Sequence, residues 1–524
     1  MTDPMQAIDA AVASVTDPSD SAQIAAALRS VSPALVDDVI FGVASSTVGS
    51  TADGVLLGVG LAASAGIGVG LIATDPSAAL DAWERGTEVV LLVDETRPED
   101  EPAMRVASAI VCRRGGVASH AAIIARQWGV PAVCGIGELD VAEGDRVLVD
   151  GATGEVRRLD DVTTPTERAA GEPDRPLEEM PAGLVTLLDW ADAVVGSKVA
   201  VMANADQAAD VVLALALGAR GVGLCRTEHQ FLGDDAGIIS RSLTGDADAL
   251  DELTSLQRST LDALLREVGR APVTVRLLDA PVHEFGAAHV EHNPMLGVRG
   301  VRLSVSRPDL LVAQAEGIAH AIADSVLAVD GIDTRPDVRV LVPMVALADE
   351  MKWARSVLSD TFFRVGIERG VDLDVPIGTM IETPRAALIG SALATHSDFF
   401  AFGTNDLTQL TYGFSRDDLD QQLMPEYRRI GFVARSPFET LDGSGVVRLM
   451  ALATETGRAQ RPDLGLSMCG EHGGDPASIS IAIQLGLHEI SVSPYRVPAT
   501  RLAAAHAVLG PAAPAVPDGP GSAS

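Results

Sequence analysis

Eight short apolar runs between residues 199 and 492 constrain the fold of this chain more than any other feature. Stretches with helical periodicity separate them, and each run is short enough to be a single buried strand. Eight strands that alternate with helices over about 330 residues are typical of a (β/α)8 barrel of the TIM type. The predicted strands are Val199–Ala203, Gly221–Cys225, Val273–Leu278, Val338–Val345, Ile377–Ile381, Phe399–Phe402, Leu466–Met468 and Ile490–Val492.

Polar side chains lie at or near the C-terminal ends of most of these runs. In a (β/α)8 barrel the C-terminal strand ends form the face that carries the active site. The pattern therefore predicts an enzyme whose reacting groups gather on one rim. The residues concerned are Asn204, Arg226, Arg276 with Asp279, Glu382, Asn405 with Asp406, and Cys469.

The rest of the chain divides into four segments by composition. Residues 57–159 hold strand-like runs and one clear helix after His120, which predicts a compact α/β domain. Residues 160–182 carry four prolines and several charges, which indicates a linker before the barrel at 183–510. Residues 1–56 form a short N-terminal segment with one expected helix near 22–31, stopped by Pro33. We expect a disordered tail at 511–524.

Composition excludes several classes of partner. The net charge is −33, from 39 basic and 72 acidic residues, so nucleic acid and anionic lipid would be repelled. Val55–Thr74 has no charge and is long enough to span a bilayer, but five glycines interrupt it, and LAASAG favours a turn between two strands. We expect no membrane span. The four cysteines, Cys112, Cys134, Cys225 and Cys469, have neither the spacing of a disulfide framework nor that of a metal finger. Because free cysteines are typical of a reducing compartment, we expect a cytoplasmic location.

The segment GGVASHAAIIARQWGVPAV places His120 directly before an apolar helix. Gly115 and Gly116 allow a close approach of the backbone to an anion, and a helix N-terminus stabilises phosphate. A histidine at this point can carry a phosphoryl group as a nucleophile. A helix-capping histidine without chemistry is the alternative.

Longer blocks make a resemblance specific. GGVASHAAIIAR resembles the phosphohistidine segment of the enzymes that use phosphoenolpyruvate (PEP), in which a swivelling domain carries the histidine between distant sites. The match runs from about 57 to 506 and indicates the pyruvate, phosphate dikinase family. The barrel blocks that carry it are GVGLCRTEHQF (221–231), VRLLDAPVHEF (275–285), NPMLGVRGVRL (293–303), GTMIETPRAAL (378–388), FGTNDLTQLTYGFSRDD (402–418) and CGEHGGDP (469–476).

The resemblance assigns three arginines to substrate. Arg226 and Arg276 match the family's phosphate-binding arginines, and Arg299 looks like a third. The chemistry agrees, since PEP carries a phosphate and a carboxylate and guanidinium forks suit both. Salt bridges at the barrel rim are the alternative role for these residues.

The resemblance also implies a metal. Glu382 and Asp406 match the carboxylates that hold Mg²⁺, a hard cation that takes a few carboxylates and substrate oxygens. Gly403, Thr404 and Asn405 complete a loop that resembles the family's substrate-binding turn. The alternative for the two carboxylates is that they only partner the arginines.

Cys469 is the cysteine with an expected chemical role. Removal of the phosphoryl group from PEP leaves an enolate that must gain a proton at carbon to become pyruvate. A thiol at a strand end can serve as this general acid. The resemblance assigns the role to the cysteine of CGEHGG; a buried packing role is the alternative.

The family carries a nucleotide-binding domain of the ATP-grasp type before its histidine domain, whereas about 55 residues precede that domain here. We therefore expect one half-reaction, in which PEP and His120 give pyruvate and phosphohistidine, with the ATP half-reaction left to a separate nucleotide-binding protein. The alternatives are a phosphocarrier protein phosphotransferase like Enzyme I, which would pass phosphate to a carrier protein, and a non-catalytic dikinase-like subunit. The resemblance further implies a homodimer formed through the barrel.

Overall fold

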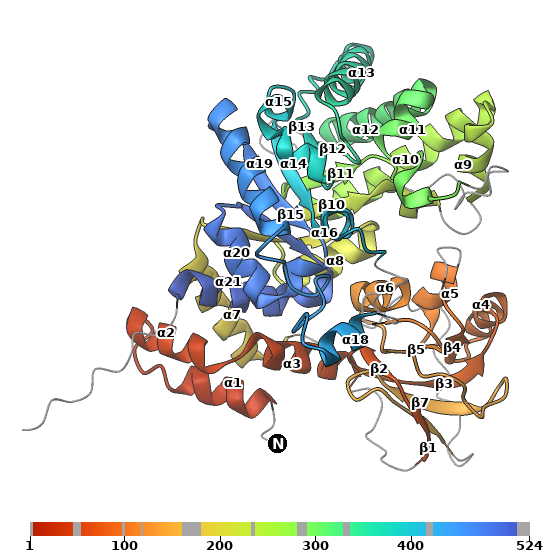
Figure 1. The fold of residues 1–524 in the computed structure, drawn as a ribbon, viewed down its shortest axis with the longest axis vertical. Helices are drawn as coiled ribbons and strands as arrows, with labels where there is room; N and C mark the ends of the chain where they lie inside the picture. The colour runs from red at the N-terminus through yellow and green to blue at the C-terminus, as the bar shows by residue number, and fades with distance from the viewer. Residues whose placement is uncertain are drawn as a thin grey trace, which may run out of the picture.

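The computed structural model describes residues 4–45, 54–96, 100–116, 119–159, 180–231, 236–279, 291–328, 336–415 and 423–510. It contains an eight-stranded mixed sheet followed by a closed eight-stranded parallel barrel (Figure 1). The α/β fold class predicted from the sequence is confirmed. Most of the expected linker and the whole expected tail lie outside the described residues.

The barrel strands follow one another in chain order, and β16 closes the ring on β9 with parallel pairing throughout. Each predicted run overlaps one observed strand, with ends that differ by no more than three residues. The strands are β9 (Ala200–Asn204), β10 (Val222–Arg226), β11 (Val273–Arg276), β12 (Val338–Val342), β13 (Ile377–Ile381), β14 (Phe399–Gly403), β15 (Gly465–Cys469) and β16 (Glu489–Val492).

Helices surround the barrel, which explains why its strands are continuous apolar runs. β13 and β14, for example, are buried at every residue. The main outer helices are α7 (Ala182–Val195), α8 (Ala208–Ala216), α10 (Ala247–Val268), α12 (Pro308–Leu327), α13 (Ala348–Arg369), α14 (Pro384–Leu388), α15 (Gly390–Ala394), α19 (Val446–Gln460), α20 (Pro476–Gln484) and α21 (Val497–Leu509). Shorter elements follow the strands: η2 (Thr227–Phe231), α9 (Ala236–Leu243), η5 (Pro294–Leu296), α11 (Val301–Ser306), α16 (Thr404–Tyr412), α18 (Met424–Arg429), η7 (Glu471–Gly474) and η8 (Pro494–Arg496).

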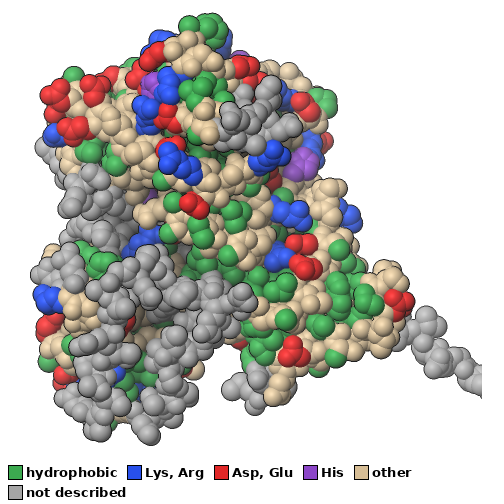
Figure 2. Space-filling model, turned by 180° about the vertical axis from the view of Figure 1, so that it is seen from behind, with side chains coloured by type: hydrophobic (Ala, Val, Ile, Leu, Met, Phe, Trp, Pro, Cys, Tyr) green, Lys and Arg blue, Asp and Glu red, His purple; other side chains and the backbone are tan. Residues whose placement is uncertain are grey.

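Within the described residues, one helix, α12, has the length and apolar composition of a membrane span. It packs between α10 and α13, and 67% of its most apolar window is buried. Over the barrel face seen in Figure 2, basic and acidic side chains lie interspersed. Many arginines therefore have acidic neighbours; Arg339, for example, pairs with Glu489 at 2.7 Å.

The smaller sheet has the strand order β1-β8-β7-β3-β4-β5-β6-β2. The uncharged stretch Val55–Thr74 forms strands, as predicted, but there are three of them, β1, β2 and β3, rather than two. The prediction of a turn at LAASAG was wrong for its first four residues, which form β2; Gly66, with φ 125°, lies between β2 and β3. The strands are β1 (Val55–Val59), β2 (Leu61–Ser64), β3 (Ile67–Ala73), β4 (Val89–Val93), β5 (Ala109–Cys112), β6 (Ala132–Cys134), β7 (Arg146–Asp150) and β8 (Glu155–Arg158), and the helices are α4 (Pro76–Glu84), α5 (Glu101–Val106) and α6 (His120–Trp128).

The N-terminal segment holds three helices, α1 (Pro4–Ala13), α2 (Ser21–Ser30) and α3 (Pro33–Ser45), rather than the one expected. α2 lies where the sequence predicted it, and its last residue precedes Pro33. Pro33 itself begins α3, because the first turn of a helix does not need the N–H that proline lacks. α1 packs on α7 and α3 on α21, so these helices extend the core of the barrel.

Candidate active site

The C-terminal ends of the barrel strands bring the predicted residues to one rim. Arg226, Arg276 and Cys469 are the last residues of β10, β11 and β15. Glu382 directly follows β13, and Gly403 ends β14. These residues are far apart in the sequence but close in space, because neighbouring parallel strands end at the same edge of the barrel.

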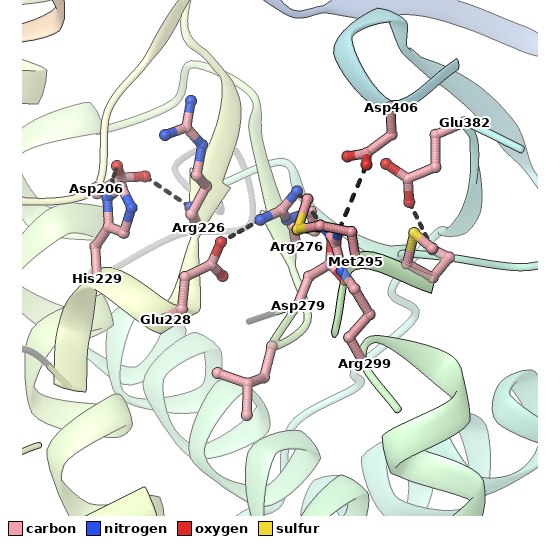
Figure 3. A network of polar contacts seen from close by, with 12 residues as sticks. Asp206, Arg226, Glu228, His229, Arg276, Asp279, Met295, Arg299, Glu382 and Asp406 are labelled. Carbon is pink, nitrogen blue, oxygen red and sulfur yellow. Dashed lines mark hydrogen bonds and ion pairs between the residues drawn. The ribbon is translucent and has the colours of Figure 1, made fainter. Parts of the chain in front are cut away.

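Arg276 is held by two carboxylates. Its guanidinium pairs with Glu228 in η2 and lies 3.3 Å from Asp279 Oδ2 through Nη1 (Figure 3). Burial alone would lower the pKa of Arg276, but Glu228 and Asp279 outweigh it and raise the pKa above its usual value. Nε of Arg276 and Oε2 of Glu228 are buried without a hydrogen-bond partner among the described residues. Orphaned buried polar atoms of this kind are what a polar ligand would satisfy.

Arg299 lies beside Arg276 and shares one of its partners. It donates from Nε and Nη2 to the two oxygens of Asp279, at 3.0 and 2.8 Å. Its Nη1 lies 3.4 Å from Asp406 Oδ1. Burial opposes the charge on Arg299, but Asp279 and Asp406 raise its pKa well above the usual value. The bidentate pair fixes the plane of a permanently charged fork.

Arg226 is positioned through its backbone. Asp206 is almost wholly buried, and its Oδ1 accepts the Arg226 N–H at 2.6 Å. Oδ2 of the same carboxylate contacts His229 Nδ1 at 2.8 Å. Burial would raise the pKa of Asp206, but His229 and Arg226 hold it well below its usual range. The Arg226 side chain therefore leaves β10 from a fixed point, and Figure 3 shows Arg226 beside Arg276.

Glu382 is buried, and its carboxylate is held by the backbone N–H of a residue in a strained conformation. Its Oε1 accepts the N–H of Met344 at 2.6 Å. Met344 has φ 58°, the one non-glycine residue in the described ranges with a positive φ. Burial, Asp279 and Asp406 all raise the pKa of Glu382 well above its usual value. Such strain at a functional group is common in active sites.

Gly403 lets this carboxylate approach the backbone of β14. A Cβ at Gly403 would lie 2.7 Å from Glu382 Oε2 and 2.9 Å from Glu382 Cβ. Any other residue at this position would displace Glu382. The glycine of the predicted substrate turn thus has a steric role that the sequence alone did not reveal.

The donor set fits Mg²⁺. Glu228, Asp279, Glu382 and Asp406 bring four carboxylates against the guanidiniums of Arg276 and Arg299. The carboxylates outnumber the guanidiniums, and all of their negative charge lies on oxygen atoms, which are hard ligands. This suits a divalent cation bound by few carboxylates and by substrate oxygens. No cluster of three or more His, Cys, Asp or Glu side chains in the described part of the chain could hold a metal unaided. A site of two carboxylates and substrate agrees with both observations.

Thr404 and Asn405 begin α16 and are fixed by the loop after β15. His472 Nε2 lies 2.8 Å from the Pro437 carbonyl, which can only accept, so Nε2 carries the proton. Burial lowers the pKa of His472, which keeps the ring neutral. Its Nδ1 therefore accepts the Thr404 hydroxyl proton at 2.8 Å. Asn405 Oδ1 accepts the Glu471 N–H at 3.2 Å, which orients the carboxamide.

Cys469 is a buried thiol at the same rim. Its Sγ lies 3.8 Å from the Phe402 carbonyl oxygen. Burial raises its pKa to about 12, with Arg276 opposing and Glu382 adding to the shift. The group therefore stays protonated near neutral pH, as a proton donor must. Cys225 is buried in the core of the barrel, which agrees with packing.

His120 is the first residue of α6, and its side chain lies outside the described part of the structure. The cap of this helix is Ser119, whose Oγ accepts the Ala122 N–H at 3.4 Å. The capping role considered for His120 thus belongs to its neighbour. Gly115 has φ 117° in the loop before the cap. Figure 1 shows α6 on the side of the smaller domain that faces the barrel.

Comparison with known proteins decides the family. The PEP-binding domain of PEP-utilising enzymes matches residues 184–509, and the mobile domain of these enzymes matches residues 86–154. The chain belongs to the PEP-utilising enzyme family. Similar curated PEP-utilising enzymes are pyruvate, phosphate dikinase 1 of Arabidopsis thaliana chloroplasts (39% identical; 86% of this chain, 50% of the relative) and pyruvate, phosphate dikinase of Clostridium symbiosum (37%; 87% and 55%). The chain thus spans about half the length of the curated relatives it matches.

Sequence reasoning missed three residues of this candidate site. Asp206 and Glu228 lie within two residues of the ends of β9 and β10. The search for polar residues at strand ends was therefore correct in principle but did not extend far enough along the chain. Met344 gave no signal, because its role rests on backbone conformation. The alternative role of the arginines is partly realised, since Arg276 and Arg299 do form ion pairs.

Proposed function

We propose that this chain transfers a phosphoryl group between PEP and His120, with formation of pyruvate. The observation that supports the proposal best is the rim itself. Arg226, Arg276 and the protonated thiol of Cys469 end strands of one barrel, and Glu382 directly follows another. Arg299 and Asp406 come from the segments after the strands and pair with each other at the same rim. The relatives that match most of the chain carry the name pyruvate, phosphate dikinase.

Substrate binding falls to the guanidiniums. Arg226 and Arg276 would receive the phosphate and Arg299 would complete the positive side of the pocket, since a guanidinium fork matches phosphate oxygens. The buried Nε of Arg276, which has no described partner, is a donor available to substrate. Glu382 and Asp406 would hold Mg²⁺, whose chemistry is to neutralise charge on the phosphoryl and enolate oxygens. Gly403, Thr404 and Asn405 would form the turn against which PEP rests.

The reaction needs one phosphoryl transfer and one proton transfer. An imidazole nitrogen of His120 forms a bond to phosphorus while the bond from phosphorus to the enol oxygen of PEP breaks. The electron pair stays on that oxygen as an enolate. Cys469 Sγ–H then donates its proton to the terminal carbon of the enolate, giving the methyl group of pyruvate and a thiolate. Arg276 favours this thiolate, because it lowers the pKa that burial raises.

Several broader assignments belong to the same proposal. Residues 57–159 would be the mobile unit and 160–182 its hinge, with residues 1–56 attached to the barrel at 183–510. A separate nucleotide-binding protein would run the ATP half-reaction. The barrel would form a homodimer, for which Phe363 and Ile367 on α13 offer exposed apolar side chains, 72% and 71% accessible. The enzyme would work in the cytoplasm.

The test is a single-turnover experiment. Purified protein is mixed with Mg²⁺ and PEP radiolabelled in its phosphate, and acid-labile label and released pyruvate are counted. Stoichiometric label that His120→Ala abolishes, while PEP binding persists, is the expected result. Folded protein that binds no label and releases no pyruvate would refute the proposal.

A further inference from the structure

Two ion pairs join the smaller domain to the rim of the barrel. Arg126 on α6 lies 3.3 Å from Glu471, in η7 after β15. Arg105 on α5 lies 2.6 Å from Asp210, which is in the first turn of α8 after β9. The four side chains are between 12% and 29% exposed. Both pairs therefore form in a partly desolvated interface on the face of the barrel that carries the site.

Each cation is held in place by its own domain. Arg126 Nη1 donates to the Ala63 carbonyl on β2 at 2.9 Å. The Arg105 guanidinium lies over the Trp128 ring, 5.1 Å from its centroid. Since these side chains are already ordered, pairing with the barrel costs little side-chain entropy.

A close backbone contact accompanies the ion pairs. Gly129 caps α6 with φ 64°, and a Cβ at this position would lie 2.3 Å from Tyr495 Cε2 in η8. The C-terminal end of α6 therefore rests directly on the barrel. His120 begins the same helix, about 9 Å along its axis from Arg126 at 1.5 Å per residue. Contacts at one end of α6 thus hold the helix that carries the phosphorylated residue.

The two barrel carboxylates also contact the pocket. Asp210 Oδ2 accepts the N–H groups of Asp206 and Gln207, at 3.4 and 3.2 Å. Asp206 in turn holds the backbone of Arg226. The residue with the other carboxylate, Glu471, donates its own N–H to Asn405 Oδ1. Each ion pair is therefore one or two contacts away from a proposed substrate-binding residue.

We propose that Arg105–Asp210 and Arg126–Glu471 form a latch that holds the phosphohistidine domain on the barrel and couples its docking to the PEP pocket. The inference rests on the proposed function, in which His120 must reach this pocket and leave it. When the domain departs, Asp210 and Glu471 lose their guanidiniums. Their contacts to Asp206 and Asn405 must then readjust, so docking and the arrangement of the pocket change together.

The test variant is the double substitution Asp210→Asn with Glu471→Gln. Both are isosteric, both keep the backbone N–H groups, and neither disturbs the contacts of Arg126 and Arg105 within their own domain. The matched control is Arg114→Gln, an arginine 63% exposed that pairs with Asp94 and Glu95 in the smaller domain. It removes a charge without touching the interface.

Docking is measured by energy transfer between dyes, without reference to catalysis. Glu138→Cys on the smaller domain and Asp463→Cys on the barrel accept the dyes, since these side chains are 94% and 83% exposed and the four native cysteines are buried. The double variant should raise the ratio of undocked to docked protein about tenfold, from two pairs worth about threefold each. High salt should have the same effect on the parent, and Arg114→Gln should match the parent. An unchanged ratio in the double variant would overturn the latch.

Two further measurements separate the latch from its alternatives. The charge swap Arg126→Glu with Glu471→Arg should restore docking that Glu471→Arg alone weakens. No restoration would overturn the direct contact between these two side chains. PEP should raise the docked fraction of the parent more than that of the double variant, because coupling is reciprocal. An equal rise in both would overturn the coupling. If the dyes respond as expected but the parent forms no phosphohistidine, the proposed function fails and the latch stands.

Discussion

Replacement of Gly403 by alanine tests the geometry of the site with a single methyl group. The new Cβ would lie 2.7 Å from Glu382 Oε2, 2.9 Å from Glu382 Cβ and 3.1 Å from Met380 Sδ. The backbone φ of Gly403 is −81°, which alanine adopts without strain. Any effect of the substitution therefore comes from the clash between the new methyl group and its neighbours. Carbon and oxygen in ordinary contact lie about 3.4 Å apart, so Glu382 must retreat by more than half an ångström from its hydrogen bond to Met344.

The expected consequence is large for activity and moderate for stability. Overpacking of this kind costs about 1–3 kcal/mol of folding free energy. A reacting group displaced by about 1 Å can cost about a hundredfold in rate, so we expect kcat/KM for PEP to fall between about tenfold and a hundredfold. Pyruvate release at saturating and limiting Mg²⁺ measures the effect, and the Mg²⁺ requirement should rise in parallel. Thermal unfolding reports the stability.

Gly237→Ala is the matched control, because a Cβ at that position in α9 meets no atom within 4 Å. It should leave both rate and Mg²⁺ dependence unchanged. If Gly403→Ala retains the parent's rate and Mg²⁺ dependence, then Glu382 is not held where the structure places it. The assignment of Glu382 to the metal would then lose its structural support.

The remaining predictions concern single groups of the site. Cys469→Ala should still form phosphohistidine but release pyruvate more slowly by about a hundredfold or more, seen by counting both products; equal rates would remove the thiol as proton donor. The pKa of Glu382 is raised by burial and by neighbouring carboxylates, so the folded state holds a proton that the unfolded state releases and stability falls as pH rises above the ordinary glutamate range. Glu382→Gln should therefore unfold at a higher temperature than the parent at neutral pH without Mg²⁺, and Mg²⁺ should stabilise only the parent. Arg299→Lys should lose one of two hydrogen bonds to Asp279 and raise KM for PEP by about tenfold, measured by steady-state kinetics.

The barrel was predictable because its strands are buried on both faces. Parallel strands covered by helices read as unbroken apolar runs, and Ile377–Ile381 was predicted with the bounds that the structure shows. The site was predictable for the same reason, since polar residues that end such runs must meet at one rim. The weakest prediction was the N-terminal segment. Its helices α1 and α3 bury residues against α7 and α21, and no local pattern identifies partners that lie about 180 and 460 residues away.

What the sequence could not supply was the set of contacts that fix the site. Asp279 was marked only as a neighbour of Arg276, yet it is the shared partner of two arginines. The tautomer of His472 follows from the Pro437 carbonyl, a backbone group without any sequence signature. Positions of this kind depend on which backbone groups meet in space, and side-chain identity carries no information about that.

In the proposed function, a chain of net charge −33 must bind a small, highly charged anion. The long-range field of the protein repels PEP, so recognition must be local and strong enough to overcome it. Arg276 and Arg299 are buried and oriented by carboxylates, which keeps both forks charged in a low-dielectric site. Those carboxylates cancel much of the positive charge that would attract substrate, so the arginines provide geometry more than net attraction. A divalent cation between Glu382 and Asp406 would restore the missing positive charge. We therefore expect the arginines to select the shape of PEP and the metal to determine the affinity for it.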